Sequence, residues 1–286
     1  MSFALYRDFA SIEELDAQYN LDDNVPDFPK YIESYISRSA MARETLDCSL
    51  DVPFGPTVEE HLDIFRAETQ GGPAMVFIHG GYWRITSSKE WSFLADGPVA
   101  AGYSTFVTNY ALCPKVTIGE IVRQHRAAIA WIYRNAEELG IDRQRIIVTG
   151  HSAGGHAVAE VLATDWQADY GLPADVVKAG VAISGVFDLR PLPNTFLAPW
   201  LQLNQTDVAR LSPQLNIPRS IPPLAVMYGS QETQEFRRQS IDYHDSCKEA
   251  GLDVELMALP RHHFDILDDL ADNQGPIFRA VDKLAS

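Results

Sequence analysis

Short apolar runs recur along most of the chain, and longer stretches with helical periodicity separate them. The clearest runs are AMVFIH (74–79), STFVTNY (104–110), RIIVTG (145–150), KAGVAIS (178–184), PLAVMYG (223–229) and DVELMAL (253–259). Each run is short and almost continuously apolar, which is typical of a strand buried on both faces of a parallel sheet. The pattern therefore predicts a parallel sheet built from these six strands.

Two of the intervening stretches show an apolar face at helical spacing. The first face holds Ile121, Val122, Ala128, Ile129 and Ile132, and the second holds Phe236, Ser240, Tyr243 and Cys247. We predict that the first helix ends at Gly140 and the second at Gly251, since glycine is favoured just after a helix.

The chain begins differently. Residues 1–45 are polar and predict helical pieces, which could pack over a domain edge or cover a pocket mouth. Two half-apolar runs then flank residues 53–56, Pro-Phe-Gly-Pro, and predict an antiparallel hairpin. We therefore expect an N-terminal helical extension over 1–45 and one α/β domain over 46–286. Its sheet should be mixed and mainly parallel, with helices on both faces.

Composition narrows the class of protein. The chain has 286 residues, 46% of them hydrophobic, and a net charge of −16. This charge opposes binding to nucleic acid or anionic membranes. No apolar run is long enough to span a bilayer, and the first residues do not resemble a signal peptide. Three widely spaced cysteines favour free thiols and a cytoplasmic location. A small-molecule substrate is the expected partner, and a homodimer is left open.

The segment GHSAGG contains a G-x-S-x-G pattern centred on Ser152. A predicted strand precedes the serine, and small residues suited to a helix start follow it. Such a turn presents a serine hydroxyl at a helix N-terminus, where developing negative charge is favoured. The pattern thus predicts a nucleophile, and the alternative is a serine that merely caps the helix.

A serine nucleophile needs backbone N–H groups that bind the oxyanion. The segment FIHGGYWR follows the first predicted parallel strand, and its two glycines allow amides to point at a ligand. We expect the donors to be the N–H groups of Gly81, Tyr82 and Ala153. The alternative is a tight loop whose aromatic side chains belong to the core.

The histidine and the acid should follow the last two strands. Of His262 and His263, we choose His263, because the next residues predict a docked helix that would fix its orientation. Glu232 is the expected acid, in the loop after residues 223–229, and Asp188 is its rival. The order Ser152, Glu232, His263 is the order of an α/β-hydrolase triad.

With these motifs in place, the chain resembles the arylformamidase (kynurenine formamidase) group of α/β-hydrolases, whose oxyanion signature is HGGxW. The matching segments are EELDAQYN, VPFG, HGGYW, NYALCPKVTIGEIV, GHSAGGH, SGVFDLRPL, ETQEFRRQS and HHFDI, in the family's order. In that family the residues matching Ser152 and His263 are nucleophile and base. The family's acid is usually Asp, so Glu232 departs from the pattern.

The resemblance implies hydrolysis of N-formylkynurenine to kynurenine and formate, through a formyl-enzyme and without metal or cofactor. An anilide leaving group would need aromatic walls, and the candidates are Tyr82, Trp83, Phe196 and Trp200. The segment 189–205, which carries the last two, could equally be an ordinary connection. Two alternatives remain: an esterase or aryl-acylamidase with the same triad, and a non-catalytic ligand-binding protein of this fold.

Overall fold

The structure, a computed structural model, describes residues 5–286. Within them the strands form one eight-stranded sheet in the order β1-β2-β4-β3-β5-β6-β7-β8. The strands are β1 (Cys48–Pro53), β2 (His61–Phe65), β3 (Gly72–Ile78), β4 (Ser104–Thr108), β5 (Ile141–His151), β6 (Ala179–Ile183), β7 (Leu224–Gly229) and β8 (Val254–Leu259). β2 pairs antiparallel with β1 and β4, and all other pairs are parallel. The predicted mixed sheet is confirmed.

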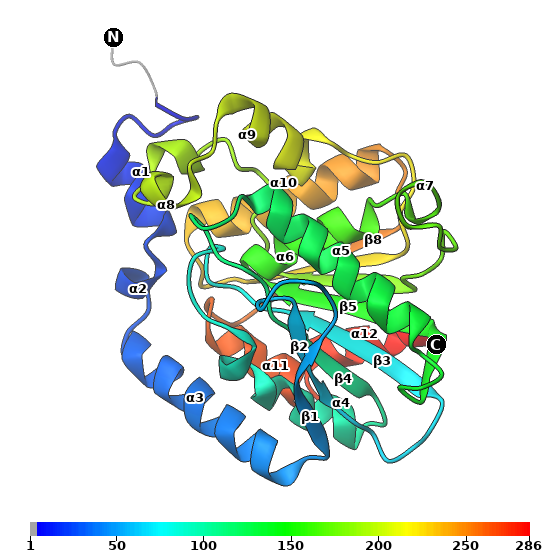
Figure 1. Cartoon of the computed structure of the whole chain (residues 1–286). Coiled ribbons are helices and arrows are strands. Elements are labelled where there is room, and N and C mark those ends of the chain that lie inside the picture. Colours follow the sequence, from blue (N-terminus) through cyan, green and yellow to red (C-terminus); the bar gives the residue numbers. More distant parts are fainter. Residues whose placement is uncertain (1–4) are drawn as a thin grey trace.

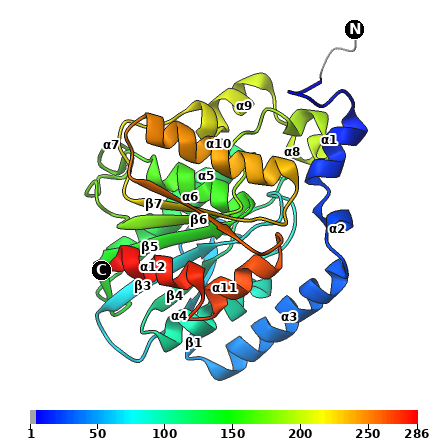
Figure 2. The ribbon, with the colours of Figure 1, turned by 180° about the vertical axis from the view of Figure 1, so that it is seen from behind.

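Helices cover both faces of this sheet (Figures 1 and 2). One face carries α5 (Ile118–Arg134), α6 (Ala153–Leu162) and α10 (Gln234–Glu249), and the other carries α4 (Asp96–Ala100), α11 (Asp268–Ala271) and α12 (Pro276–Ala285). Alternate residues of β3 belong to two different buried hydrophobic clusters. Val76 and Ile78 belong to the first, and Met75 and Phe77 belong to the second. This alternation explains why the central strands read as continuous apolar runs.

The remaining helices lie in the connections. They are α1 (Ile12–Tyr19), α2 (Leu21–Asn24), α3 (Phe28–Thr45), α7 (Trp166–Tyr170), α8 (Ala198–Leu201) and α9 (Gln205–Leu211). The 3₁₀ turns are η1 (Ser88–Glu90), η2 (Ser92–Ala95), η3 (Leu192–Asn194), η4 (Pro213–Leu215) and η5 (Asp265–Leu267). None of the helices in the described part of the chain is long and apolar enough to cross a membrane. The three cysteines are free.

Two predicted elements differ from the structure. The run 253–259 was expected to be buried on both faces, yet β8 is the edge strand, and Glu255 and Met257 are exposed. The helix predicted to end at Gly140 ends at Arg134, where the N–H of Asn135 donates to the Trp131 carbonyl. Gly140, at φ +67°, instead forms part of the turn into β5. In contrast, α10 ends just before Gly251 as predicted, and Gly251 has φ +79°.

The N-terminal segment runs down one side of the molecule, from α1 through α2 to the long helix α3 (Figure 1). Its polar contacts reach three separate loops at the carboxyl edge of the sheet. The Tyr19 carbonyl accepts from the Tyr82 hydroxyl at 2.7 Å, and the Gln18 carbonyl accepts from the Thr233 hydroxyl at 2.8 Å. The Tyr35 hydroxyl donates to the Phe264 carbonyl at 2.6 Å. A covering role for residues 1–45 stays a prediction, and residues 1–4 lie outside the described part.

Candidate active site

Ser152 lies at the sharp turn between β5 and α6. Its φ of +58° and ψ of −117° are unusual for a residue with a side chain, and such a conformation costs on the order of 1–3 kcal/mol. Close packing imposes the turn: a Cβ at Gly154 would overlap the Ile78 carbonyl oxygen. The serine side chain makes no capping hydrogen bond to α6. The strained turn and the missing cap both argue against a simple capping serine and favour a nucleophile.

The proposed acid and base lie together beside this turn. Glu232 follows β7 and His263 follows β8, and these neighbouring parallel strands end at the same edge of the sheet. His263 Nδ1 lies 2.7 Å from Glu232 Oε1, in hydrogen-bond geometry. His263 is 3% exposed and Ser152 is also 3% exposed. The rings of His263 and His151, the residue before Ser152, are 4.3 Å apart.

The rival acid, Asp188, is held by a different set of partners. Its Oδ2 accepts from the Tyr6 hydroxyl at 2.6 Å, and its Oδ1 accepts from Arg190 Nε at 2.9 Å. The carboxylate therefore anchors the N-terminal segment to the loop after β6. Its hydrogen bonds leave Glu232 as the better partner for His263.

His262 also has a separate structural role. Its Nδ1 accepts from the backbone N–H of Phe264 at 3.1 Å, which stabilises the turn into η5. Its ring lies edge-on to Tyr31 of α3, with centroids 4.7 Å apart. The ring thus packs between the turn and the N-terminal segment, so the choice of His263 as the base stands on geometry as well as on position.

The expected oxyanion donors lie in the loop after β3 and at the start of α6. Gly81, Tyr82 and Trp83 have φ values of +107°, +50° and +56° in succession. A Cβ at Gly80 would approach the Ser152 Cβ to 3.1 Å, so this loop lies directly against the nucleophile. In residues 5–286, the N–H groups of Gly81, Tyr82 and Ala153 donate to no protein acceptor. They are therefore available to a bound oxyanion.

Burial controls the charge of the acid–base pair. It lowers the pKa of His263 to about 3 and raises the pKa of Glu232 to about 7. At neutral pH the imidazole is therefore neutral and can accept a proton. When the pair takes up a further proton, the imidazole loses either its basic nitrogen or its hydrogen-bond acceptor on Glu232. Activity should thus be full above pH 7 and fall as the pH drops through this value.

We expect Glu232→Gln to lower kcat by about 10⁴-fold, because an amide no longer fixes the Nδ1–H tautomer or stabilises the imidazolium. The variant should also lose the acid-side inflection near pH 7 in its kcat/KM profile. Stopped assays from pH 5 to 9 would measure both effects. Asp188→Asn is the comparison. A folded Asp188→Asn that loses as much activity as Glu232→Gln would contradict this assignment.

The predicted aromatic walls divide into three groups. Tyr82 lies edge-on to Phe236 and to Phe196, with centroids 6.4 Å away in each case, and Phe236 contacts His263. Trp200 is 45% exposed and lies further out, on α8. The prediction for Trp83 is corrected: it is 1% exposed and packs edge-on against His156. Trp83 supports the loop from behind, as the alternative core interpretation held.

Sequence reasoning missed a group of buried histidines around the site. They are His79, His125, His151 and His156. Burial lowers the pKa of each, to about 4 for His79 and well below the ordinary value for His151. The His79 ring stacks on Tyr110 at 4.1 Å, and Tyr110 lies edge-on to His125. Their positions in the sequence could have indicated two of them, since His79 and His151 each adjoin a predicted site motif at the end of a central strand.

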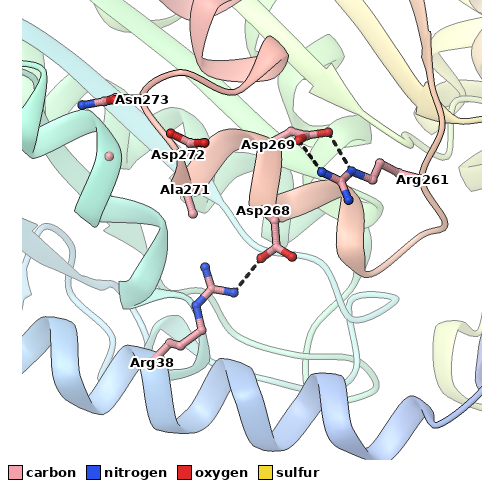
Figure 3. A pocket seen from close by; sticks show the side chains of 8 residues that line it. Arg38, Arg261, Asp268, Asp269, Ala271, Asp272 and Asn273 are labelled. Atoms are coloured by element: carbon pink, nitrogen blue, oxygen red, sulfur yellow. Dashed lines mark hydrogen bonds and ion pairs between the residues drawn. The ribbon is translucent and has the colours of Figure 1, made fainter.

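A cavity of about 560 Å³ opens elsewhere, between α3, α4 and α11 (Figure 3). Its lining contains neither Ser152 nor His263. Its charged groups pair with one another: Arg38 with Asp268 at 2.6 Å, and Arg261 with Asp269 at 2.8 Å. Of the charged groups that line the cavity, only Asp272 makes no ion pair with another described residue.

Three side chains that could together bind a metal ion lie beside the ammonium group of a lysine. Asp51, His61 and Asp63 bring their ligand atoms within 4.8 Å of one another. Lys89 Nζ lies 2.7 Å from Asp51 Oδ1 and 2.6 Å from Asp63 Oδ1. The ammonium group takes the place between the carboxylates where a metal ion would bind, so the cluster is an ion-pair network that is buried at Asp63 and exposed at Asp51.

The sheet order and the strand ends that carry these residues define an α/β-hydrolase. The BD-FAE family model matches residues 62–246, and the chain belongs to this family of α/β-hydrolases. The match includes Ser152, Glu232 and the oxyanion loop. The protein is thus a hydrolase by fold and family.

Individual relatives include both amidases and esterases. The kynurenine formamidase of Danio rerio is 28% identical over 92% of both chains, and that of Salmo salar is 30% identical over 81% of this chain and 80% of its own. Esterase LipQ of Mycobacterium tuberculosis is 28% identical over 74% of this chain and 56% of its own. A crystal structure from Silicibacter sp., described as a "putative thioesterase", has 29% identity and a TM-score of 0.82, covering 94% and 99% of the two chains.

Proposed function

We propose that this protein is a serine hydrolase that cleaves aryl formamides, with N-formylkynurenine as its substrate and kynurenine and formate as products. The observation that carries the proposal is the similarity to kynurenine formamidases over nearly the whole chain. The site is compatible with this substrate: Ser152 is 3% exposed, and the oxyanion loop packs against its Cβ. A buried serine of this kind suits a small acyl group such as formyl.

The proposed reaction uses four proton transfers through His263. The imidazole accepts the Ser152 proton as Oγ attacks the formyl carbon, and the backbone N–H groups of Gly81, Tyr82 and Ala153 bind the oxyanion. His263 then protonates the anilide nitrogen as the C–N bond breaks, which leaves a formyl ester on Ser152. Water, deprotonated by His263, then attacks this ester, and the imidazolium returns that proton to Ser152 Oγ as formate leaves. Each oxyanion donor would contribute about 10²–10³ in rate.

The leaving aryl group has an aromatic environment available. Phe236 contacts the His263 ring at 4.6 Å, and Tyr82 and Phe196 continue the same surface outward. Rings in edge-to-face contact offer flat apolar walls that suit an aniline. We therefore assign the aryl side of the substrate to Tyr82 and Phe196, with Phe236 buried behind them.

A second candidate is a carboxylesterase acting on small esters, because esterases are also among the relatives and the same residues would serve. Acyl size separates the two. If the site admits formyl only, formanilide should exceed acetanilide in kcat/KM by at least about 10–200-fold, the usual effect of one unaccommodated carbon.

Steady-state turnover of N-formylkynurenine, formanilide, acetanilide and short p-nitrophenyl esters tests the proposal. We expect N-formylkynurenine to have the highest kcat/KM. A preference for the esters would favour the esterase. Absence of turnover of every substrate, together with tight binding of one, would favour a ligand-binding protein of the same fold.

A further inference from the structure

Arg84 extends from the oxyanion loop and has no protein partner for its charge. Its backbone N–H donates to the Gly81 carbonyl at 3.0 Å, so the residue closes the turn that contains Tyr82. Its side chain makes no hydrogen bond or ion pair with any residue from 5 to 286, and Nε is shielded from solvent. A guanidinium carries five N–H donors, and a buried donor without an acceptor is costly. This arrangement points to an anionic ligand.

Two aromatic rings hold the guanidinium in place. Its Cζ lies 6.0 Å from the centroid of Phe196 and 5.6 Å from that of Trp200. Phe196 also contacts Tyr82, and the Phe196 backbone N–H is fixed by Asp16 at 2.6 Å. Contact with aromatic faces orients a guanidinium while leaving its N–H edge free for a carboxylate. The charge thus sits at the outer end of the surface assigned above to the aryl group.

One carboxylate near this cation does not pair with it. Asp22 of α2 is an exposed residue; partial burial of its carboxyl raises its pKa, and the charge of Arg84 opposes that rise. Geometry places the two groups in the same region: Asp22 follows Tyr19 by three residues, Arg84 follows Tyr82 by two, and the Tyr82 hydroxyl donates to the Tyr19 carbonyl at 2.7 Å. No ion pair within 4.0 Å joins Asp22 and Arg84. An anion bound to Arg84 alone would be repelled by Asp22. A ligand with adjacent negative and positive groups would satisfy both residues.

We propose that Arg84 and Asp22 bind the zwitterionic α-amino acid head of the substrate, Arg84 its carboxylate and Asp22 its ammonium. This inference rests on the proposed function and defines its specificity: an aryl formamide with an amino acid side chain. The formyl oxygen and the head group would then bind to the same loop, two residues apart at Tyr82 and Arg84. Phe196 and Trp200 would hold the guanidinium in position.

The test compares two substrates in wild type, Arg84→Gln and Arg84→Lys. N-formylkynurenine carries the head group, and formanilide lacks it. Arg84→Gln should raise KM for N-formylkynurenine and lower kcat/KM by about 10–100-fold, the usual effect of a lost charge-assisted pair. Its kcat/KM for formanilide should change by less than about threefold. Arg84→Lys should recover part of the loss, because it restores the charge without the bidentate geometry.

Asp22→Asn tests the ammonium contact. It should weaken binding of N-formylkynurenine but not binding of the analogue that lacks the α-amino group. Arg143→Gln is the matched control, because the Arg143 guanidinium lies 5.6 Å from the Tyr133 ring, near the start of β5 and away from the carboxyl edge. This control should leave the kinetics of both substrates unchanged.

The outcomes separate the two proposals. A wild-type enzyme that leaves N-formylkynurenine intact but hydrolyses esters would overturn the proposed function and, with it, this inference. Normal turnover of N-formylkynurenine with unchanged kinetics in Arg84→Gln would overturn only the role of Arg84. An equal loss for both substrates would also overturn it, since that pattern indicates damage to the oxyanion loop.

Discussion

Ser152→Ala should abolish turnover, with kcat reduced by about 10⁵–10⁶-fold, the scale on which serine hydrolases lose activity when their nucleophile is removed. The size of the effect follows from the geometry. No other hydroxyl occupies the strained turn between β5 and α6, where Gly80 and His151 pack around the Ser152 side chain. The variant removes one oxygen from a buried site and leaves the backbone unchanged, so it should fold normally.

Steady-state assays with N-formylkynurenine and with an ester measure this loss, and circular dichroism checks the fold. Ser230→Ala is the matched control. Ser230 is exposed in the loop after β7, at the same edge of the sheet, and should tolerate the change with full activity. Retention of more than about 1% of wild-type kcat by a folded Ser152→Ala would contradict a serine nucleophile.

His263→Ala should cost nearly as much, about 10⁵–10⁶-fold in kcat, because the base and the nucleophile act as one unit. His262→Ala gives the sharpest comparison, since the two histidines are neighbours in the chain. His262 stabilises the turn into η5 and contacts Tyr31, so its loss should affect stability more than kcat.

The double variant Ser152→Ala/His263→Ala should be no less active than either single variant, because removing one member already disables the unit. Purified variants assayed at one pH would show this. A larger loss in His262→Ala than in His263→Ala would reverse the assignment of the base. Additive losses in the double variant would indicate that the two residues act in separate steps.

The sequence was most informative where a single physical constraint dominates. Burial on both faces makes the central strands continuously apolar, so β3 to β7 could be recognised from their side chains alone. β8 could not be distinguished from them, because an edge strand can carry a similar apolar run while exposing residues such as Met257. The helix end predicted at Gly140 was wrong for a related reason. A glycine indicates a turn, but it does not show which helix or strand lies next to that turn.

The candidate site follows from the sheet in the same way. Parallel strands end at a common edge, so residues after β3, β5, β7 and β8 had to lie near one another. What the sequence could not supply is side-chain direction and pairing over long distances. Trp83 turns into the core, and Asp188 pairs with Tyr6, which lies 182 residues away in the chain. Such pairings depend on where the N-terminal segment packs.

Covalent labelling of the nucleophile is the most direct test of the proposed chemistry. The intact protein would be incubated with a fluorophosphonate, and the adduct would be located by peptide mass spectrometry. We expect one adduct per chain, on Ser152, formed in step with loss of N-formylkynurenine hydrolysis and absent in His263→Ala over the same time. An active protein that remains unlabelled, or that is inactivated by an adduct on another residue, would show that Ser152 is not the nucleophile.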